Sequence, residues 1–362
     1  MRRRVLLASV SAGIATTTAG CAVFGGDGGG SSSKQRLIFS GQDGATIGQA
    51  VAIDSTTALA GANKGGAEYV VTEHTDGSWD DTERFSLDIG QEPARVALSG
   101  DTGLLGGGGA ATVIERTDSG WEEKTTLRSE ADSPEPRFAV GLDEGTAAVT
   151  RENGVEVFER QDGSWEQQTV LNVPGWSIAV AGSTIVVGSS DATVGDVSDA
   201  GRIHVFEKTG GTWSQTAQLT EGDPSEGLRL GQSVGVATGT VVAGALSDTS
   251  ENQEGTGGVY VFTDGDNGWS QQTVLTPPAV GSAVDTTGDR LLVGSAQLGR
   301  AFLYTNSGGM WEQTRTFSDN ETEGTSRFGQ TVGLTDDWAV VGDEFDLTEE
   351  NYENGAAYFF PV

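Results

Sequence analysis

The chain has 362 residues, of which 55 are glycine and only 8 are proline. Many glycines with few prolines are typical of short strands joined by tight turns, because glycine adopts the positive φ angles that such turns need. The 52 acidic and 21 basic residues leave a formal net charge of −31. A negative field of this size repels phosphate backbones, so we expect no nucleic-acid partner.

The acidic residues are spread along the chain. This distribution is typical of a solvated surface that stays soluble in concentrated salt, where charge repulsion is screened within about 3 Å at 1 M. The composition therefore predicts an acidic protein of a halophilic organism.

Residues 1–20 have the pattern of an export signal. Arg2-Arg3-Arg4 is followed by an apolar stretch from Val5 to Ala19, which is too short to span a bilayer comfortably. The paired arginines resemble a twin-arginine signal. The next residues, Val5-Leu6-Leu7, match that signal only loosely, so the general secretory route stays open.

Cys21 is the only cysteine of the chain, and Thr18-Ala19-Gly20-Cys21 resembles a lipobox. In such signals the cysteine is lipidated and becomes the new N-terminus. We therefore expect an exported protein that is lipid-anchored on the outer face of the cytoplasmic membrane. The alternative is a plain secretory peptide with an incidental cysteine. Residues 21–33, rich in glycine and serine, predict a flexible tether.

A tryptophan signature recurs six times, at intervals of 42 to 56 residues. Each copy follows a short turn such as Asp76-Gly77-Ser78 and begins a segment of alternating polarity. Intervals of this size indicate propeller blades or helical arrays, and the absence of an amphipathic helical pattern favours blades. The six residues are Trp79, Trp121, Trp165, Trp213, Trp269 and Trp311.

Between these tryptophans lies a unit of three further strands, which occurs seven times. A short strand and a tight turn lead to an apolar strand that ends in a small residue, and a third strand follows, as in Gly231–Phe262. The last unit stops at Val362 without a tryptophan strand, whereas an orphan strand, Lys34–Phe39, precedes the first unit. We therefore predict that residues 34–362 form an all-β, seven-bladed propeller of four-stranded antiparallel blades, closed by the N-terminal strand in the last blade.

The repeated unit resembles the FG-GAP repeat of integrin α-subunit heads. Phe328-Gly329 carries the FG, Leu230-Gly231 is an apolar-Gly version, and Ala60-Gly61-Ala62 stands at the GAP end without its proline. The resemblance covers residues 40–362 and implies a propeller. Repeats of this family often hold calcium between their first two strands. That loop is here a tight turn such as Thr238-Gly239-Thr240, so we expect no calcium site there and no cofactor.

Few residues of the chain suit catalysis or metal binding. Only two histidines are present, His74 and His204, and both fall on or after third strands, away from the central funnel. Neither a catalytic triad nor a zinc site is expected. Longer acidic loops, such as Asp191 to Asp199, are read as solvated loops, with Ca²⁺ or Mg²⁺ binding as the alternative.

Two aromatic residues depart from the repeat. Trp176 stands where other units have Gln49, Gln232 or Gln330, and Trp338 begins the second strand of the last unit. Both are candidates for stacking on a ligand, and local packing is the alternative. Asn320 begins a glycosylation sequon, a tripeptide that is also common by chance.

These observations predict a non-enzymatic, monomeric surface lipoprotein whose propeller is an interaction or adhesion scaffold for a protein or a glycan. The membrane is contacted only through the lipid anchor. The alternative is a secreted hydrolase or lyase that acts on polysaccharide with carboxylates in the funnel.

Overall fold

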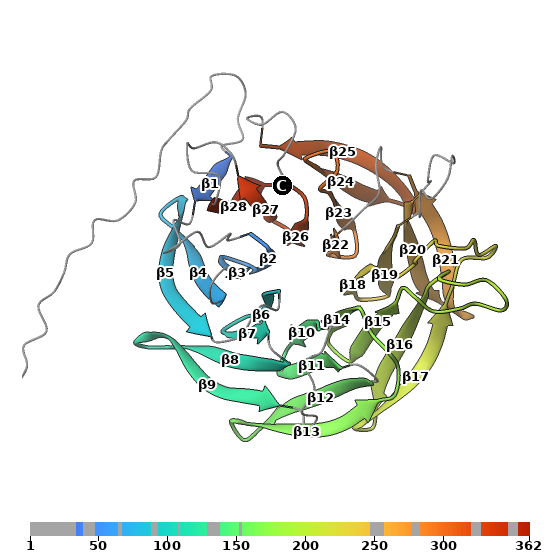
Figure 1. Cartoon of the computed structure of the whole chain (residues 1–362), viewed down its shortest axis with the longest axis horizontal. Helices are drawn as coiled ribbons and strands as arrows, with labels where there is room; N and C mark the ends of the chain where they lie inside the picture. The colour runs from blue at the N-terminus through green and yellow to red at the C-terminus, as the bar shows by residue number, and fades with distance from the viewer. Residues whose placement is uncertain are drawn as a thin grey trace, which may run out of the picture. The chain divides into compact units, whose positions relative to one another are not determined.

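A computed structural model describes residues 34–38, 48–63, 67–87, 93–107, 109–128, 138–151, 154–246, 257–276, 283–319, 327–346 and 354–362. These residues form 28 strands in seven separate antiparallel sheets of four strands. The sheets are arranged around a common centre, with one strand of each sheet innermost (Figure 1). The described residues contain no helix that is long and apolar enough to cross a membrane. Cys21, Asn320, the export signal and the tether lie outside them.

Each blade is numbered from the first strand of its repeat, and its strands are given from the centre outwards. Blade 1 comprises β2 (Ala50–Asp54), β3 (Thr57–Asn63), β4 (Ala67–Thr75) and β5 (Ser78–Leu87). Blade 2 comprises β6 (Arg95–Ser99), β7 (Thr102–Gly107), β8 (Ala110–Thr117) and β9 (Gly120–Arg128). Blade 3 comprises β10 (Val140–Asp143), β11 (Thr146–Arg151), β12 (Gly154–Gln161) and β13 (Ser164–Leu171).

The remaining blades follow in chain order. Blade 4 comprises β14 (Ser177–Ala181), β15 (Thr184–Ser189), β16 (Arg202–Thr209) and β17 (Thr212–Leu219). Blade 5 comprises β18 (Ser233–Ala237), β19 (Thr240–Ala245), β20 (Gly258–Gly265) and β21 (Gly268–Leu275). Blade 6 comprises β22 (Ala283–Thr286), β23 (Arg290–Ser295), β24 (Arg300–Ser307) and β25 (Met310–Ser318). Blade 7 comprises β26 (Thr331–Leu334), β27 (Trp338–Asp346), β28 (Asn354–Pro361) and β1 (Gln35–Ile38).

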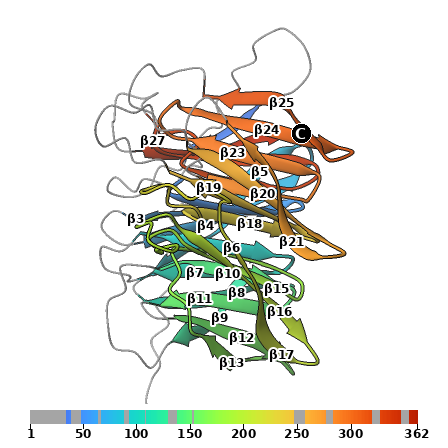
Figure 2. The same cartoon turned by 90° about the vertical axis from the view of Figure 1, so that its right-hand side faces the viewer.

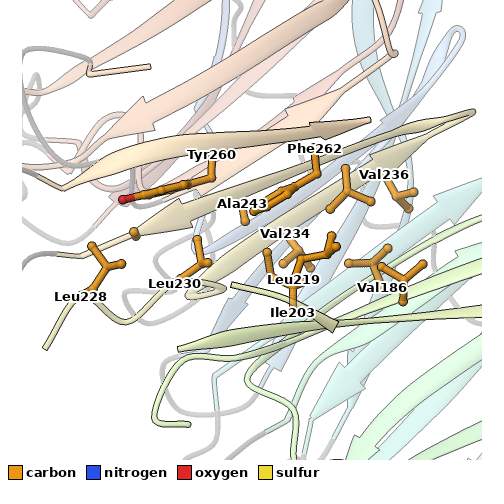
Figure 3. Close-up of a cluster of buried hydrophobic side chains, with 13 residues drawn as sticks. Val186, Ile203, Leu219, Leu228, Leu230, Val234, Val236, Ala243, Tyr260 and Phe262 are labelled. Atoms are coloured by element: carbon orange, nitrogen blue, oxygen red, sulfur yellow. The ribbon is translucent and has the colours of Figure 1, made fainter. Parts of the chain in front are cut away.

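The hydrophobic core lies between neighbouring blades, in the seams where one sheet faces the next. In the seam between blades 4 and 5, Val186 of blade 4 faces Val236 of blade 5 within one buried cluster, as Figure 3 shows. Because both faces of a blade are covered by its neighbours, the second and third strands are buried on both sides and are nearly continuous apolar runs. The stacked sheets are seen edge-on in Figure 2.

A glycine pair determines how closely blades 4 and 5 approach at their inner ends. The N–H of Gly231, which has a φ of +89°, donates to the carbonyl of Gly244 in its own blade at 3.0 Å. The carbonyl oxygen of Gly231 lies where a Cβ on Gly188 of blade 4 would stand. The same contact joins Gly294 to Gly329 and Gly342 to Gly48. The FG glycine of one blade therefore packs against the GAP glycine of the blade before it.

The three seams from blade 1 to blade 4 lack this glycine pair. They have ion pairs between their third strands instead. At the inner ends, Gly61 meets Ala94, Gly106 meets Phe138 and Gly175 meets Thr150. On the third strands, a glutamate of one blade pairs with a basic residue of the next. The pairs are Glu73–Arg116 at 2.9 Å, Glu115–Arg160 at 3.1 Å and Glu159–Lys208 at 2.7 Å.

Four of the six outer tryptophans, Trp311 with Gln272 among them, donate a hydrogen bond to the preceding blade. Trp121 Nε1 donates to Glu73 at 3.1 Å, Trp213 Nε1 donates to Glu159 at 3.0 Å, and Trp269 Nε1 donates to Glu207 at 3.3 Å. Glu73 and Glu159, which accept from Trp121 and Trp213, also form the ion pairs with Arg116 and Lys208. These contacts give the outer tryptophans concerned a structural role between blades.

The strand β1 lies along the outer side of β28, with Gln35 opposite Phe359 and Ile38 opposite Ala356. It also contacts blade 1, because the Gln35 side chain donates to the Trp79 carbonyl and accepts from the Trp79 N–H, both at 2.8 Å. In blades 1 to 6 the ladder between the third and outer strands has a bulge, for example between Val71 and Thr72. The β1–β28 ladder begins at Gln35 and Phe359 and runs to Ile38 and Ala356 without a register shift.

Replacing Gly188 by alanine is expected to reduce the free energy of unfolding by about 1–3 kcal/mol, because the new Cβ overlaps a backbone carbonyl that cannot rotate away. Gly265→Ala is the matched control, because its Cβ would meet open space. The control should change stability by no more than about 0.5 kcal/mol. Thermal and denaturant unfolding measure both variants, and equal losses would contradict the proposed role of the seam glycine.

A chain that starts at Ser40 should be less stable than one that starts at Lys34 by about 2–5 kcal/mol, because it loses the β1–β28 ladder and both Gln35 hydrogen bonds. The measurement is the melting temperature of the two truncated chains, with the full chain as reference. The chain that starts at Lys34 should have the same melting temperature as the full chain. If the chain from Ser40 also did so, β1 would not hold the ring closed.

Candidate functional site

The seven inner strands surround a central cavity of about 790 Å³. One residue of each strand, at the same register position, forms an aliphatic ring on its wall. Six of these residues are valine and one is isoleucine, and all are β-branched, which suits a strand. The aliphatic ring consists of Val51, Val96, Val140, Ile178, Val234, Val284 and Val332.

In each inner strand, the residue that follows the member of the aliphatic ring is alanine or glycine in six blades and aspartate in blade 6. A small residue is needed here because this position faces the inner strand of the next blade; a Cβ on Gly141, for example, would lie 2.9 Å from Val180 Cγ2. The six small residues are Ala52, Ala97, Gly141, Ala179, Gly235 and Gly333. Asp285 takes their place in blade 6 and lines the cavity.

Asp285 is held by two backbone hydrogen bonds. Its Oδ1 accepts from the N–H of Thr286 at 2.8 Å, and its Oδ2 accepts from the N–H of Leu334 in blade 7 at 2.8 Å. Burial raises the pKa of Asp285 to about 6, although these two bonds act in the opposite direction. The carboxyl therefore titrates near neutrality and joins blades 6 and 7.

Sequence reasoning did not single out Asp285. The signal was present, because the repeat places Ala or Gly there in the other blades. The chain has many acidic residues, and Asp285 is distinguished from the others only when the inner strands of the seven blades are aligned by their strand pairing.

Two further acids stand at the turn end of the cavity and connect neighbouring blades. Asp54 accepts from the N–H of Gly100 at 2.6 Å, and Asp143 accepts from the N–H of Gly182 at 2.6 Å. Ser99 also donates to Asp143 at 3.0 Å. Each of these acids therefore satisfies a turn N–H of the next blade, which gives them a structural role at the rim.

Trp176 lies at the other end of the inner strands, on the side of the loops that join second and third strands. Its N–H donates to the carbonyl of Gly188 at 2.8 Å, and 36% of the residue is exposed. In blade 1 the corresponding Gln49 binds neighbouring blades on both sides, at Ala94 N–H and Glu344. Trp176 thus presents an aromatic ring where a glutamine otherwise connects blades.

Trp338 is half-buried in an aromatic cluster at the seam between blades 7 and 1. Its ring centroid is 4.8 Å from that of His74 and 5.5 Å from that of Trp79. Trp79 in turn stacks on Phe359 at 4.3 Å. This environment matches the packing alternative for Trp338, while the stacking hypothesis for both tryptophans stays a prediction.

The two histidines lie on the third strands β4 and β16, apart from the cavity lining. His204 is buried, and burial together with the charge of Arg202 lowers its pKa. Among the described residues no group of three or more His, Cys, Asp or Glu side chains could hold a metal ion. The acidic loop that contains Asp191 and Asp199 falls within that described part.

Replacing Asp285 by alanine, the residue of three other blades, should change how stability depends on pH. Folding raises the carboxyl pKa from 3.8 to about 6, so the ionised form destabilises the native state above that pH and the protonated form does not. The stability of the unmodified protein relative to Asp285→Ala should therefore rise by about 2 kcal/mol between about pH 7.5 and 4.5.

Thermal unfolding of both proteins over this pH range makes the comparison, and Asp289→Ala, on the exposed turn of the same hairpin, is the control. A difference between the unmodified protein and Asp285→Ala that does not change with pH would contradict the raised pKa.

The fold is shared with solved propeller structures of low sequence identity. A putative 6-phosphogluconolactonase from Bacteroides uniformis superposes with a TM-score of 0.58 at 12% identity, covering 75% of this chain and 85% of that chain. The similar protein of Bacteroides fragilis gives 0.57 at 10% identity, over 75% and 84%. The RRP9 WD40 repeats give 0.57 at 11% identity, over 90% and 97%. At these identities the likeness concerns the fold alone.

No curated protein sequence shows detectable similarity to the chain. The model of the FG-GAP repeat matches residues 213–262 and 311–360. Both matches contain an FG glycine and the glycine whose carbonyl accepts its N–H, Gly231 with Gly244 and Gly329 with Gly342. Each match starts at the tryptophan of an outer strand and ends in the third strand of the next blade. The chain is therefore a seven-bladed β-propeller that carries FG-GAP repeats.

Proposed function

We propose that the protein is a non-enzymatic surface lipoprotein whose propeller is a scaffold for binding a protein or a glycan. The observation that carries the proposal is Trp176, an exposed aromatic ring at a position where three other blades have glutamine. A rigid, half-exposed indole supplies contact area for a sugar or a protein at a small cost in conformational entropy. The lipobox at Cys21 supplies the anchor.

Asp285 favours the second candidate function, a hydrolase or lyase with a carboxylate in the funnel. A carboxyl that titrates near neutrality in a cavity suits general acid–base chemistry. Glycoside cleavage needs a second carboxyl at a defined distance. The other acids of the cavity lining are Asp54, Asp143 and Glu144, and the first two bind turn N–H groups. We therefore rank the binding scaffold first.

The anchor is tested with Cys21→Ser. The unmodified chain should fractionate with membranes and incorporate a labelled fatty acid, because the cysteine carries the lipid. The variant should appear in the medium without label. Membrane association of Cys21→Ser would contradict the lipid anchor while leaving the binding role of the propeller open.

The binding role is tested on glycan and peptide arrays with the full chain and Trp176→Ala. Loss of the aromatic platform should weaken capture by roughly tenfold or more. Met310→Ala is the matched control, because Met310 is 68% exposed at the first residue of the outer strand β25. Turnover of an arrayed glycan or peptide that Asp285→Asn abolishes would instead establish the enzyme.

A further inference from the structure

The first residue of each outer strand follows a repeated pattern that blade 6 breaks. In blades 1 to 6 this residue pairs with the last residue of the third strand and closes the hairpin between them. Five blades have serine, threonine or glycine there, whereas blade 6 has Met310 opposite Ser307. The hairpin itself therefore does not require a methionine. The five small residues are Ser78, Gly120, Ser164, Thr212 and Gly268.

Met310 is directed to solvent. It is 68% exposed, the largest exposed fraction of any large apolar residue in the described part of the chain. A Cβ on Gly308, in the turn that leads to Met310, would stand in open space. The next side chain, Trp311, is anchored, because its Nε1 donates to Gln272 of blade 5 at 2.9 Å. The thioether of Met310 therefore stands in the open beside a fixed strand.

Met310 is also the only sulfur-containing residue of the propeller, residues 34–362. The other two in the chain are Met1, in the expected export signal, and Cys21, in the expected lipid anchor. Among the aromatic side chains that strong oxidants attack, Trp79 and Tyr358 are fully buried. A thioether sulfur is soft and polarizable, and peroxides oxidise it readily where they can reach it. An oxidant in the medium therefore meets Met310 before other oxidisable groups of the propeller.

We propose that Met310 is a reversible oxidation site of the folded protein, with a peroxide as its substrate. The sulfur forms a bond to one peroxide oxygen, and the O–O bond breaks. The proton of the transferred oxygen moves to the leaving hydroxide, which becomes water. The sulfur loses two electrons, which the peroxide gains, and the product is methionine sulfoxide. A dithiol-dependent reductase reverses the step: the dithiol becomes a disulfide, and the oxygen leaves as water.

Oxidation at this position changes the surface and leaves the fold intact. The sulfoxide is polar, and at an exposed position its oxygen needs no buried partner. The reaction thus converts an exposed apolar side chain into a polar one at the hairpin of blade 6. Trp176 belongs to blade 4, so the site is independent of the surface proposed for partner binding.

The rate of oxidation in the folded full chain is compared with the rate in the same chain unfolded in urea. Both are treated with dilute hydrogen peroxide, and peptide mapping by mass spectrometry separates oxygen at Met310 from oxygen at Met1 or Cys21. We expect the Met310 peptide to gain one oxygen atom at about the same rate in both states, because an exposed thioether needs no local unfolding. Oxidation that is roughly tenfold or more slower in the folded chain would overturn the proposal.

Met310→Leu, a substitution of similar volume at an exposed position, is the matched control. After peroxide treatment, the unmodified chain and Met310→Leu should melt within about 2 °C of each other. Methionine sulfoxide reductases of both epimer specificities should restore the original mass of the Met310 peptide. A lower melting temperature of the treated unmodified chain alone would show that oxidation damages the fold, and an oxygen that the reductases leave in place would show that the step is not reversible. Either result would overturn the proposal.

Discussion

In three seams of the ring, a backbone carbonyl that packs against the Cα of a glycine sets the spacing between neighbouring blades. At Gly188 and Gly231 the backbones of blades 4 and 5 approach so closely that no side chain fits between them. This contact brings the inner strands together around the channel. The third and outer strands diverge from it, and larger residues such as Tyr260 and Phe262 fill the widening seam. The FG and GAP motifs are thus two halves of one contact between different blades.

The ring is held in two ways. Three described seams have the glycine contact, and the three seams from blade 1 to blade 4 have a bulkier inner contact with an ion pair on the third strands. Exposed ion pairs contribute little and are screened by salt, typically about 0–1 kcal/mol each. Packing of the glycine seams does not depend on ionic strength in this way. Concentrated salt should therefore weaken the three seams that have ion pairs more than the three seams that have the glycine contact.

Much of the fold could be predicted from the sequence, because each blade repeats the same local signals. The tryptophan turns, the GAP-like strand ends and the tight first turns indicated seven four-stranded units, and the absent tryptophan strand after Val362 pointed to Lys34–Phe39. The site was less accessible. Asp285 is unusual only relative to its register neighbours Ala52 and Gly333, and that register comes from the pairing of strands. The surroundings of Trp338 depend on His74 and Trp79, which are distant in sequence.

Each FG-GAP match begins at the outer strand of one blade and ends in the third strand of the next, so it does not coincide with a blade. This difference has a consequence for duplication of the repeat. A match such as 213–262 supplies the outer strand of blade 4 and the first three strands of blade 5. Tandem duplication of this segment would therefore leave no strand without a partner, and β1 would still be the last to join. The matched repeat and the blade therefore differ by one strand, and a duplicated repeat would bring a complete set of four strands.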